Sequence, residues 1–228
     1  MIEISDKEIA SGKILIKKIF DEDMWYKVPD YQRPYVWCDD EVYELLDDIS
    51  SAAEYNPNAQ YFLGSIVLHT MTVKQENINF QEHNLLDGQQ RLTTLYLILA
   101  VIRDISTDKK RIETCSKSIF QEANPDDNIP ERLRILFDIR IEVQDFIDKY
   151  IKTEYGTNDE ENLKIEFERN PDLSVRNMAN AIIKIKEWFN KKGNKFIDRF
   201  FPFLRNNVLL VYVASKELED AFRLFTVL

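Results

Sequence analysis

Residues 85–94 place a glycine-containing turn between a short apolar segment and a long one. Gly88 permits a tight turn, and a helix that starts after it has free backbone N–H groups and the positive end of its dipole. Arg91 adds a guanidinium that suits phosphate. The other polar side chains of the turn are Gln89, Gln90, Thr93 and Thr94. The pattern predicts an anion site, and the alternative is an Asp87 N-cap with a turn glycine.

A second polar and aromatic segment spans residues 28–37. Its prolines, Pro29 and Pro34, favour an extended backbone, which presents the side chains between and beside them. These side chains are Tyr31, Gln32, Arg33, Tyr35 and Trp37. The aromatic rings can stack on a planar base, or they can form a hydrophobic plug over the core, and both interpretations remain open.

Four elements must position these two segments. The spacing of apolar residues predicts an amphipathic helix over residues 40–54. Short apolar segments predict strands over 61–68 and 84–86. Residues 91–105 are apolar on nearly every helical face, so we expect that helix inside the fold.

The polar segment 121–130 contains two prolines and predicts a loop. It divides the chain into a mixed part, residues 1–120, and a mainly helical part, residues 131–228 with a late strand. In the second part we expect helices over 142–151, from an N-cap at Ser174, over 195–204 and from Ser215, and a strand over 207–214. The class is α+β. The last helix is still in mid-period at Leu228, so we expect a longer natural protein.

Composition excludes several classes of protein. The 228 residues carry a net charge of -10 and contain two cysteines and two histidines, too few for a Cys/His zinc cluster. The longest apolar run, Leu95 to Ile102, is much shorter than the roughly 20 residues of a membrane helix. The N-terminus lacks the layout of a signal peptide. We expect a cytoplasmic protein that does not interact with membranes.

Charge is distributed unevenly. Residues 21–54 contain eleven acidic side chains and two basic ones, whereas residues 176–205 contain eight basic side chains and two acidic ones. The basic segment can face a polyanion, or it can be a solvated helix surface.

Three segments together resemble one family: residues 29–37, residues 61–66, and residues 87–95 with the sequence Asp-Gly-Gln-Gln-Arg. They resemble the DGQQR-motif N-terminal domain of GmrSD-type, modification-dependent restriction systems, which is related in fold to ParB and sulfiredoxin. The order and spacing agree across roughly residues 10–105, and residues 208–228 resemble the family's later segment. In that family an Asn-rich, Arg-Gly motif and a His-Asn-His-type nuclease domain follow.

The resemblance implies a ParB/sulfiredoxin-like fold and a nucleotide site. Residues 87–91 would hold a nucleoside triphosphate, and Tyr31, Gln32 and Arg33 would face them. Asp87 would contact Mg²⁺, and Gln32 or Gln89 would orient the attacking water. Gly88, Gln90, Arg91, Thr93 and Thr94 complete the implied nucleotide-binding set. The Glu-Asn metal motif of ParB has no counterpart after the turn.

The resemblance also implies a function and partners. The chain would be a nucleotide-binding and hydrolysing regulatory domain of an anti-phage restriction system. Its partners would be modified or foreign DNA, a nuclease domain or subunit, and a second copy of the chain in a homodimer. The alternative is a non-catalytic DNA- or protein-binding module in which residues 87–91 are structural. Sulfiredoxin-like ATP chemistry is disfavoured because Cys38 lies in a different loop from the turn.

If residues 32–33 and 87–91 form one site, they must converge in space. Two guanidinium groups brought together repel each other, so without an anion we expect Asp87 or Asp30 to neutralise Arg33 or Arg91.

Overall fold

The structure is a computed structural model that describes residues 9–21, 24–75, 78–124, 126, 129–138 and 141–227. Its strands are β1 (Ile9–Leu15), β2 (Tyr26–Val28), β3 (Tyr61–Gln75), β4 (Ile78–Asp87), β5 (Phe120–Gln121), β6 (Arg132–Leu133), β7 (Ile135–Phe137) and β8 (Val208–Ser215). Its α-helices are α1 (Ile16–Ile19), α2 (Asp39–Tyr55), α3 (Gln89–Ile105), α4 (Lys109–Ile119), α5 (Ile141–Phe146), α6 (Glu160–Arg169), α7 (Leu173–Lys192), α8 (Asn194–Asn206) and α9 (Leu218–Val227).

The described strands form a mixed six-stranded sheet in the order β1-β8-β3-β4-β2-β7, and β5 pairs with β6 in a second, small sheet. β8 runs antiparallel to β1 and parallel to β3, while β3 and β4 are antiparallel. β2 runs parallel to both of its neighbours. Strands from the two halves of the chain therefore share one sheet, and the α+β class is confirmed.

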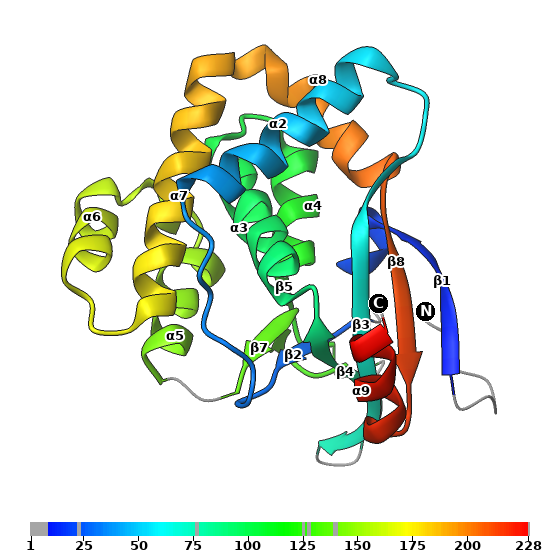
Figure 1. The fold of residues 1–228 in the computed structure, drawn as a ribbon. Helices are drawn as coiled ribbons and strands as arrows, with labels where there is room; N and C mark the ends of the chain where they lie inside the picture. Colours follow the sequence, from blue (N-terminus) through cyan, green and yellow to red (C-terminus); the bar gives the residue numbers. More distant parts are fainter. Residues whose placement is uncertain are drawn as a thin grey trace.

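Helices cover the two faces of the sheet unequally (Figure 1). Most helices gather on one side, with α3 in their middle. Ile66 and Leu68 of β3 face this side and belong to the main core, whereas Val67 packs with Leu86 and Ala221 under α9 on the other face. Alternation along β3 explains the division, because successive side chains of a strand point to opposite faces. In the described part of the chain, no helix has the length and hydropathy of a membrane span.

The two helices expected near the candidate site are confirmed. α2 spans residues 39–55 and buries Val42, Leu45, Leu46, Ile49 and Ala53. α3 spans residues 89–105, and every residue in it is buried except Arg91 and Ile105. A helix enclosed in this way holds its first turn in a fixed position, because the whole core surrounds it.

Several boundaries differ from the expected ones. β3 and β4 form a longer hairpin than the apolar segments suggest, because Thr70, Thr72 and their neighbours continue the pairing with polar side chains. The expected N-cap at Ser174 is wrong: Asp172 caps α7 by accepting from the backbone N–H groups of Ser174 and Val175. The last helix begins at Leu218, and Ser215 belongs to β8.

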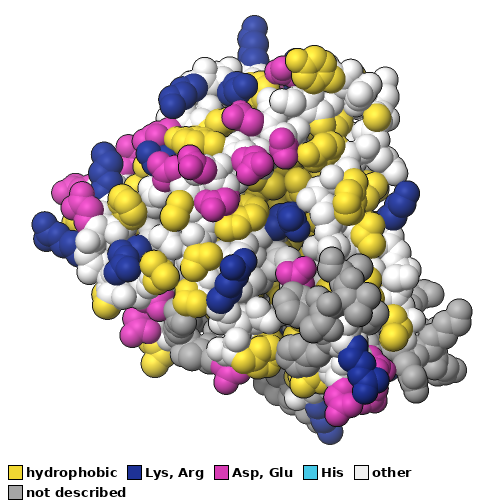
Figure 2. All heavy atoms as spheres, viewed as in Figure 1, with side chains coloured by type: hydrophobic (Ala, Val, Ile, Leu, Met, Phe, Trp, Pro, Cys, Tyr) yellow, Lys and Arg dark blue, Asp and Glu magenta, His cyan; other side chains and the backbone are white. Residues whose placement is uncertain are grey.

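The acidic and basic segments lie against each other. Lys184 of α7 is 3.4 Å from Asp39 of α2, and Arg199 of α8 is 2.9 Å from Glu54 at the other end of α2. Trp188 of α7 also donates its indole N–H to Asp47. Figure 2 shows acidic side chains gathered over α2 on this face, with Lys and Arg side chains beside them. Acidic side chains of α2 therefore form ion pairs with part of the basic segment.

Candidate functional site

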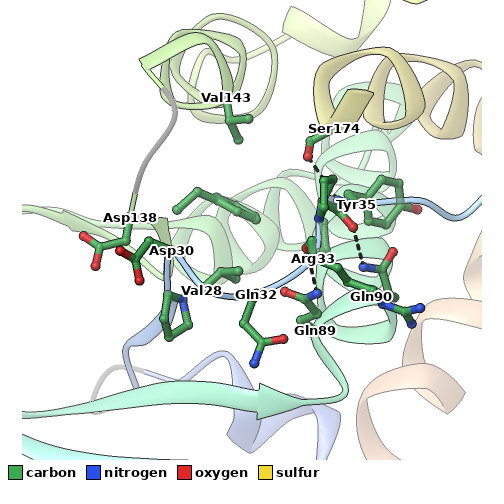
Figure 3. A pocket seen from close by; sticks show the side chains of 14 residues that line it. Val28, Asp30, Gln32, Arg33, Tyr35, Gln89, Gln90, Asp138, Val143 and Ser174 are labelled. Atoms are coloured by element: carbon green, nitrogen blue, oxygen red, sulfur yellow. Dashed lines mark hydrogen bonds between the residues drawn. The ribbon is translucent and has the colours of Figure 1, made fainter. Parts of the chain in front are cut away.

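Two glutamines at the start of α3 hold the extended loop of residues 29–38, as Figure 3 shows. Gln89 donates its amide N–H to the carbonyl of Arg33 at 2.9 Å. Gln90 donates to the carbonyl of Pro34 at 2.9 Å and accepts from the backbone N–H of Val36 at 2.8 Å. Both glutamines are buried, so these bonds satisfy amides that would otherwise be costly to enclose. The two segments converge as expected.

Tyr35 holds the same loop in place through contacts with both α7 and α3. Its backbone N–H donates to the hydroxyl of Ser174 at 3.0 Å, and its carbonyl accepts from Asn177 at 3.0 Å, so α7 binds the loop opposite α3. Its phenol pairs with the hydroxyl of Thr94 at 2.7 Å. Burial raises the pKa of the Tyr35 phenol well above its usual range, so the hydroxyl keeps its proton. The loop that carries Arg33 is thus held between two helices.

Glycines shape the other side of the turn. Gly88 adopts a left-handed conformation at φ 81°, and a Cβ atom there would lie 2.6 Å from the side chain of Ile66. Gly64 of β3 has φ 137°, and its missing side chain leaves room for the guanidinium of Arg91. That guanidinium also donates to the carbonyl of Ser65 at 3.4 Å. β3 therefore approaches the start of α3 closely because both contact points are glycines.

The loop, β3 and the turn surround a groove of about 880 Å³. The predicted site residues among those that line it are Tyr31, Gln32, Arg33, Asp87, Gly88, Gln89, Gln90 and Arg91. Trp37, one of the rings expected to stack on a base or to plug the core, also lines it. The sequence prediction did not include four further lining residues, Phe62, Gly64, Ser65 and Leu86. A volume of this size is in the range that holds small-molecule ligands.

The first turn of α3 borders this groove. The first hydrogen bond within the helix is from the N–H of Leu92 to the carbonyl of Gly88. The backbone N–H groups of Gln89, Gln90 and Arg91 precede this bond, and like those at every helix start they have no acceptor within the helix. The positive end of the helix dipole and the guanidinium groups of Arg33 and Arg91 make this end of the groove suited to an anion.

Among the described residues, neither arginine forms an ion pair with a carboxylate. In the part of the chain that the structure describes, no ion pair joins Arg33 or Arg91 to Asp30 or Asp87. The expectation that one of these acids neutralises an arginine is therefore wrong. The guanidinium of Arg91 has a neutral partner in β3, the carbonyl of Ser65. Arg33 is exposed on its loop, where water can solvate its charge. An open groove makes this possible, because water screens the two charges.

Two predicted residues lie behind the groove. Thr93 and Thr94 are almost completely buried and do not line it. The Thr94 hydroxyl also donates to the carbonyl of Gln90, so it supports the turn from inside. Gln32 has a different place: it is half-buried, lines the groove and donates to the carbonyl of Leu86 at 3.1 Å.

Metal-binding groups are sparse in the described residues. No group of three or more His, Cys, Asp or Glu side chains there could hold a metal ion. Among the described residues that line the groove, Asp87 is the one with a carboxylate. This arrangement fits Mg²⁺ that arrives with phosphates, because that ion is commonly held by one or two carboxylates together with phosphate oxygens and water. Cys38 is exposed at the start of α2 and does not line the groove.

The missed lining residues come mostly from β3. In the sequence, residues 61–66 predict only a buried strand, because an apolar run gives no sign of which side chains stay outside. Phe62 is 56% exposed in the structure. The glycine two residues later is the available signal, since a glycine in a strand marks a bulge or a close backbone approach.

Comparison with known proteins gives one family. The model of the family described as "GmrSD restriction endonuclease, N-terminal domain" matches residues 13–228. No curated protein matches the chain.

Proposed function

The chain belongs to the family of GmrSD restriction endonuclease N-terminal domains, and on that premise we propose that it binds and hydrolyses a nucleoside triphosphate to regulate a DNA-restriction system. A restriction role follows from the family, and the nucleotide chemistry is our proposal. The observation that carries it is the groove in which Arg33 and Arg91, without carboxylate partners among the described residues, meet the start of α3.

The phosphates would lie at the first turn of α3. Its free N–H groups and the dipole favour negative charge, and Arg91 adds a guanidinium that β3 fixes in place. Arg33 would approach from the loop that Gln89 and Gln90 hold. Because β3 holds the Arg91 guanidinium and Gln89 holds the backbone of Arg33, only the Arg33 side chain must become ordered when the anion binds.

Hydrolysis would depend on groups that already line the groove. Asp87 is the residue that would contact Mg²⁺, and the ion would supply charge neutralisation on the phosphates. The side-chain amides of Gln32 and Gln89 donate their N–H groups to the carbonyls of Leu86 and Arg33. Each side-chain oxygen then points away from its own bonded N–H and can accept from a water molecule, which orients that water for attack.

We propose that this domain acts with a nuclease domain or subunit on modified or foreign DNA in the cytoplasm. A self-associated form, such as a homodimer, belongs to the same proposal. The ParB-like fold that the motif resemblance implies would favour the same nucleotide assignment by analogy.

Phosphate release tests the proposal. The chain is incubated with ATP, GTP, CTP or UTP and Mg²⁺, and Arg33→Ala and Arg91→Ala are compared with Arg169→Ala, which removes an exposed arginine on α6. We expect release with at least one nucleotide, a loss of at least tenfold in both groove variants and no change in the control. Nucleotide binding without release by the wild type would support the non-catalytic alternative.

A further inference from the structure

The aromatic residues of the candidate site fall into two groups. Tyr35 is 4% exposed and belongs to the main core, and Trp37 is half-buried against it, so these two rings form the hydrophobic plug, with Trp37 also at the edge of the groove. Tyr31 and Phe62 are 52% and 56% exposed and line the groove. Packing in the core accounts for the first pair, whereas the rings of the second pair keep about half of their surface exposed at the groove.

A β-bulge places Phe62 at the groove. In the pairing of β3 with β8, Phe62 lies opposite Leu209 and Gly64 lies opposite Leu210, so Leu63 is the additional residue. Bulges change the direction of neighbouring side chains and occur often next to active sites. The same bulge contains the glycine that admits Arg91. One distortion of β3 thus brings an exposed ring and a cation to the same cavity.

The size of the cavity allows more than phosphates. Its volume of about 880 Å³ extends from the turn at Asp87–Arg91 to the rings of Tyr31 and Phe62, which come from separate segments of the chain. Exposed aromatic faces beside cationic side chains are the usual surface on which nucleic-acid bases stack. The lining therefore combines an anion end with an aromatic wall.

We propose that Phe62, with Tyr31, binds the base of the nucleotide, so that the ligand of this groove is a complete nucleoside triphosphate and its affinity does not come from the polyphosphate alone. This inference rests on the proposed function. Stacking is tolerant of base identity because every base has a π-face. The aromatic wall therefore adds affinity for nucleotides in general, and selection among bases depends on other contacts.

Calorimetric titrations with two kinds of ligand test the base site: each of the four nucleoside triphosphates with Mg²⁺, and inorganic triphosphate with Mg²⁺. The proteins are the wild-type chain, Phe62→Ala and Tyr55→Ala, in which an 83% exposed ring outside the groove is removed. We expect Phe62→Ala to bind the best nucleotide about tenfold more weakly and to bind inorganic triphosphate within twofold of the wild type. Tyr55→Ala should match the wild type with both ligands.

The outcomes separate this inference from the proposed function. Equal weakening of both ligands by Phe62→Ala, or no weakening of either, would overturn the base site. If the wild type binds inorganic triphosphate as tightly as any nucleotide and Arg91→Ala loses both, the phosphate site holds and the base site fails. If the wild type binds neither ligand, or Arg91→Ala binds both as well as the wild type, the proposed function fails as well.

Discussion

The guanidinium carbon of Arg91 lies 2.7 Å from the position that a Cβ atom on residue 64 would occupy. Glycine at 64 and arginine at 91 are thus mutually dependent, although they belong to β3 and α3. Real Cβ atoms do not approach another atom so closely, so any larger residue at 64 must displace the guanidinium or the strand. The pair shows that β3 takes part in shaping the anion end of the groove.

Replacement of Gly64 tests this dependence. We expect Gly64→Ala to reduce nucleotide affinity at least tenfold, because the new methyl group forces Arg91 out of its place beside the turn. The φ of 137° at this position adds backbone strain, so the free energy of unfolding should also fall by about 1–2 kcal/mol. Calorimetric titration and urea denaturation measure the two effects.

The matched control is Gly193→Ala. Gly193 also has a positive φ, 82°, but a Cβ atom there meets nothing within 4 Å. This variant should lose a similar amount of stability and keep its nucleotide affinity. If both glycine variants lost affinity equally, strain alone would explain the effect, and the fitted position of Arg91 would have no part in it.

Gln90 should be needed for the position of the loop. Gln90→Leu keeps a similar volume but removes both bonds to the loop, leaving the N–H of Val36 and the carbonyl of Pro34 without this partner. We expect the free energy of unfolding to fall by about 1–3 kcal/mol and hydrogen exchange of the loop amides to accelerate. Gln60→Leu, at an exposed glutamine, should leave both measurements unchanged. Equal exchange rates in the two variants would contradict the clamp.

The interior of α3 should tolerate truncation poorly. Leu95, Leu99 and Ile102 are 0%, 2% and 0% exposed, as the sequence predicts. Leu95→Ala should lower the free energy of unfolding by about 2–5 kcal/mol, since the core around this helix cannot fill the cavity completely. Leu173→Ala, at a leucine that is 39% exposed, should cost much less in the same urea denaturation. Similar costs in both variants would refute the central place of α3.

His83 should make stability depend on pH. Burial lowers its pKa from 6.5 to about 4, so below pH 6.5 the unfolded chain takes up a proton that the folded protein excludes. Neutral His83 therefore makes its full contribution to the free energy of unfolding above pH 6.5. That contribution is lost progressively as the pH falls to about 4, by about 3 kcal/mol in all. In His83→Gln, the decrease in unfolding free energy between pH 7 and pH 4 should be smaller by about this amount. An identical decrease in both proteins would contradict the shift.

Periodicity was sufficient to predict α2 and α3, because each has a continuous apolar pattern whose partner is the core itself. The convergence of the two site segments was expected from the resemblance, which implies that residues 31–33 face residues 87–91. The sequence did not predict the bonds that hold them together, from Gln89 and Gln90 to the loop carbonyls.

Other features depend on distant contacts that a single sequence does not reveal. Ser174 and Asp172 are both good capping residues two positions apart, and only the fold shows that Asp172 caps α7 while the Ser174 hydroxyl binds Tyr35. Phe62 lies in an apolar run, and its exposure results from a bulge set by pairing with β8, almost 150 residues later. Such register-dependent features need the partner strand to be known.

Direct binding tests the central claim, that Arg33 and Arg91 hold one anion at the start of α3. The measurement is a calorimetric titration of Mg²⁺ and nucleoside triphosphate into the wild-type chain, Arg33→Ala, Arg91→Ala and the double variant. We expect saturable binding by the wild type, a loss of at least tenfold in each single variant, and a double-variant loss that differs from the sum of the single losses, since both groups contact one ligand. Saturable binding that is unchanged in both single variants, or none by the folded wild type, would contradict the claim.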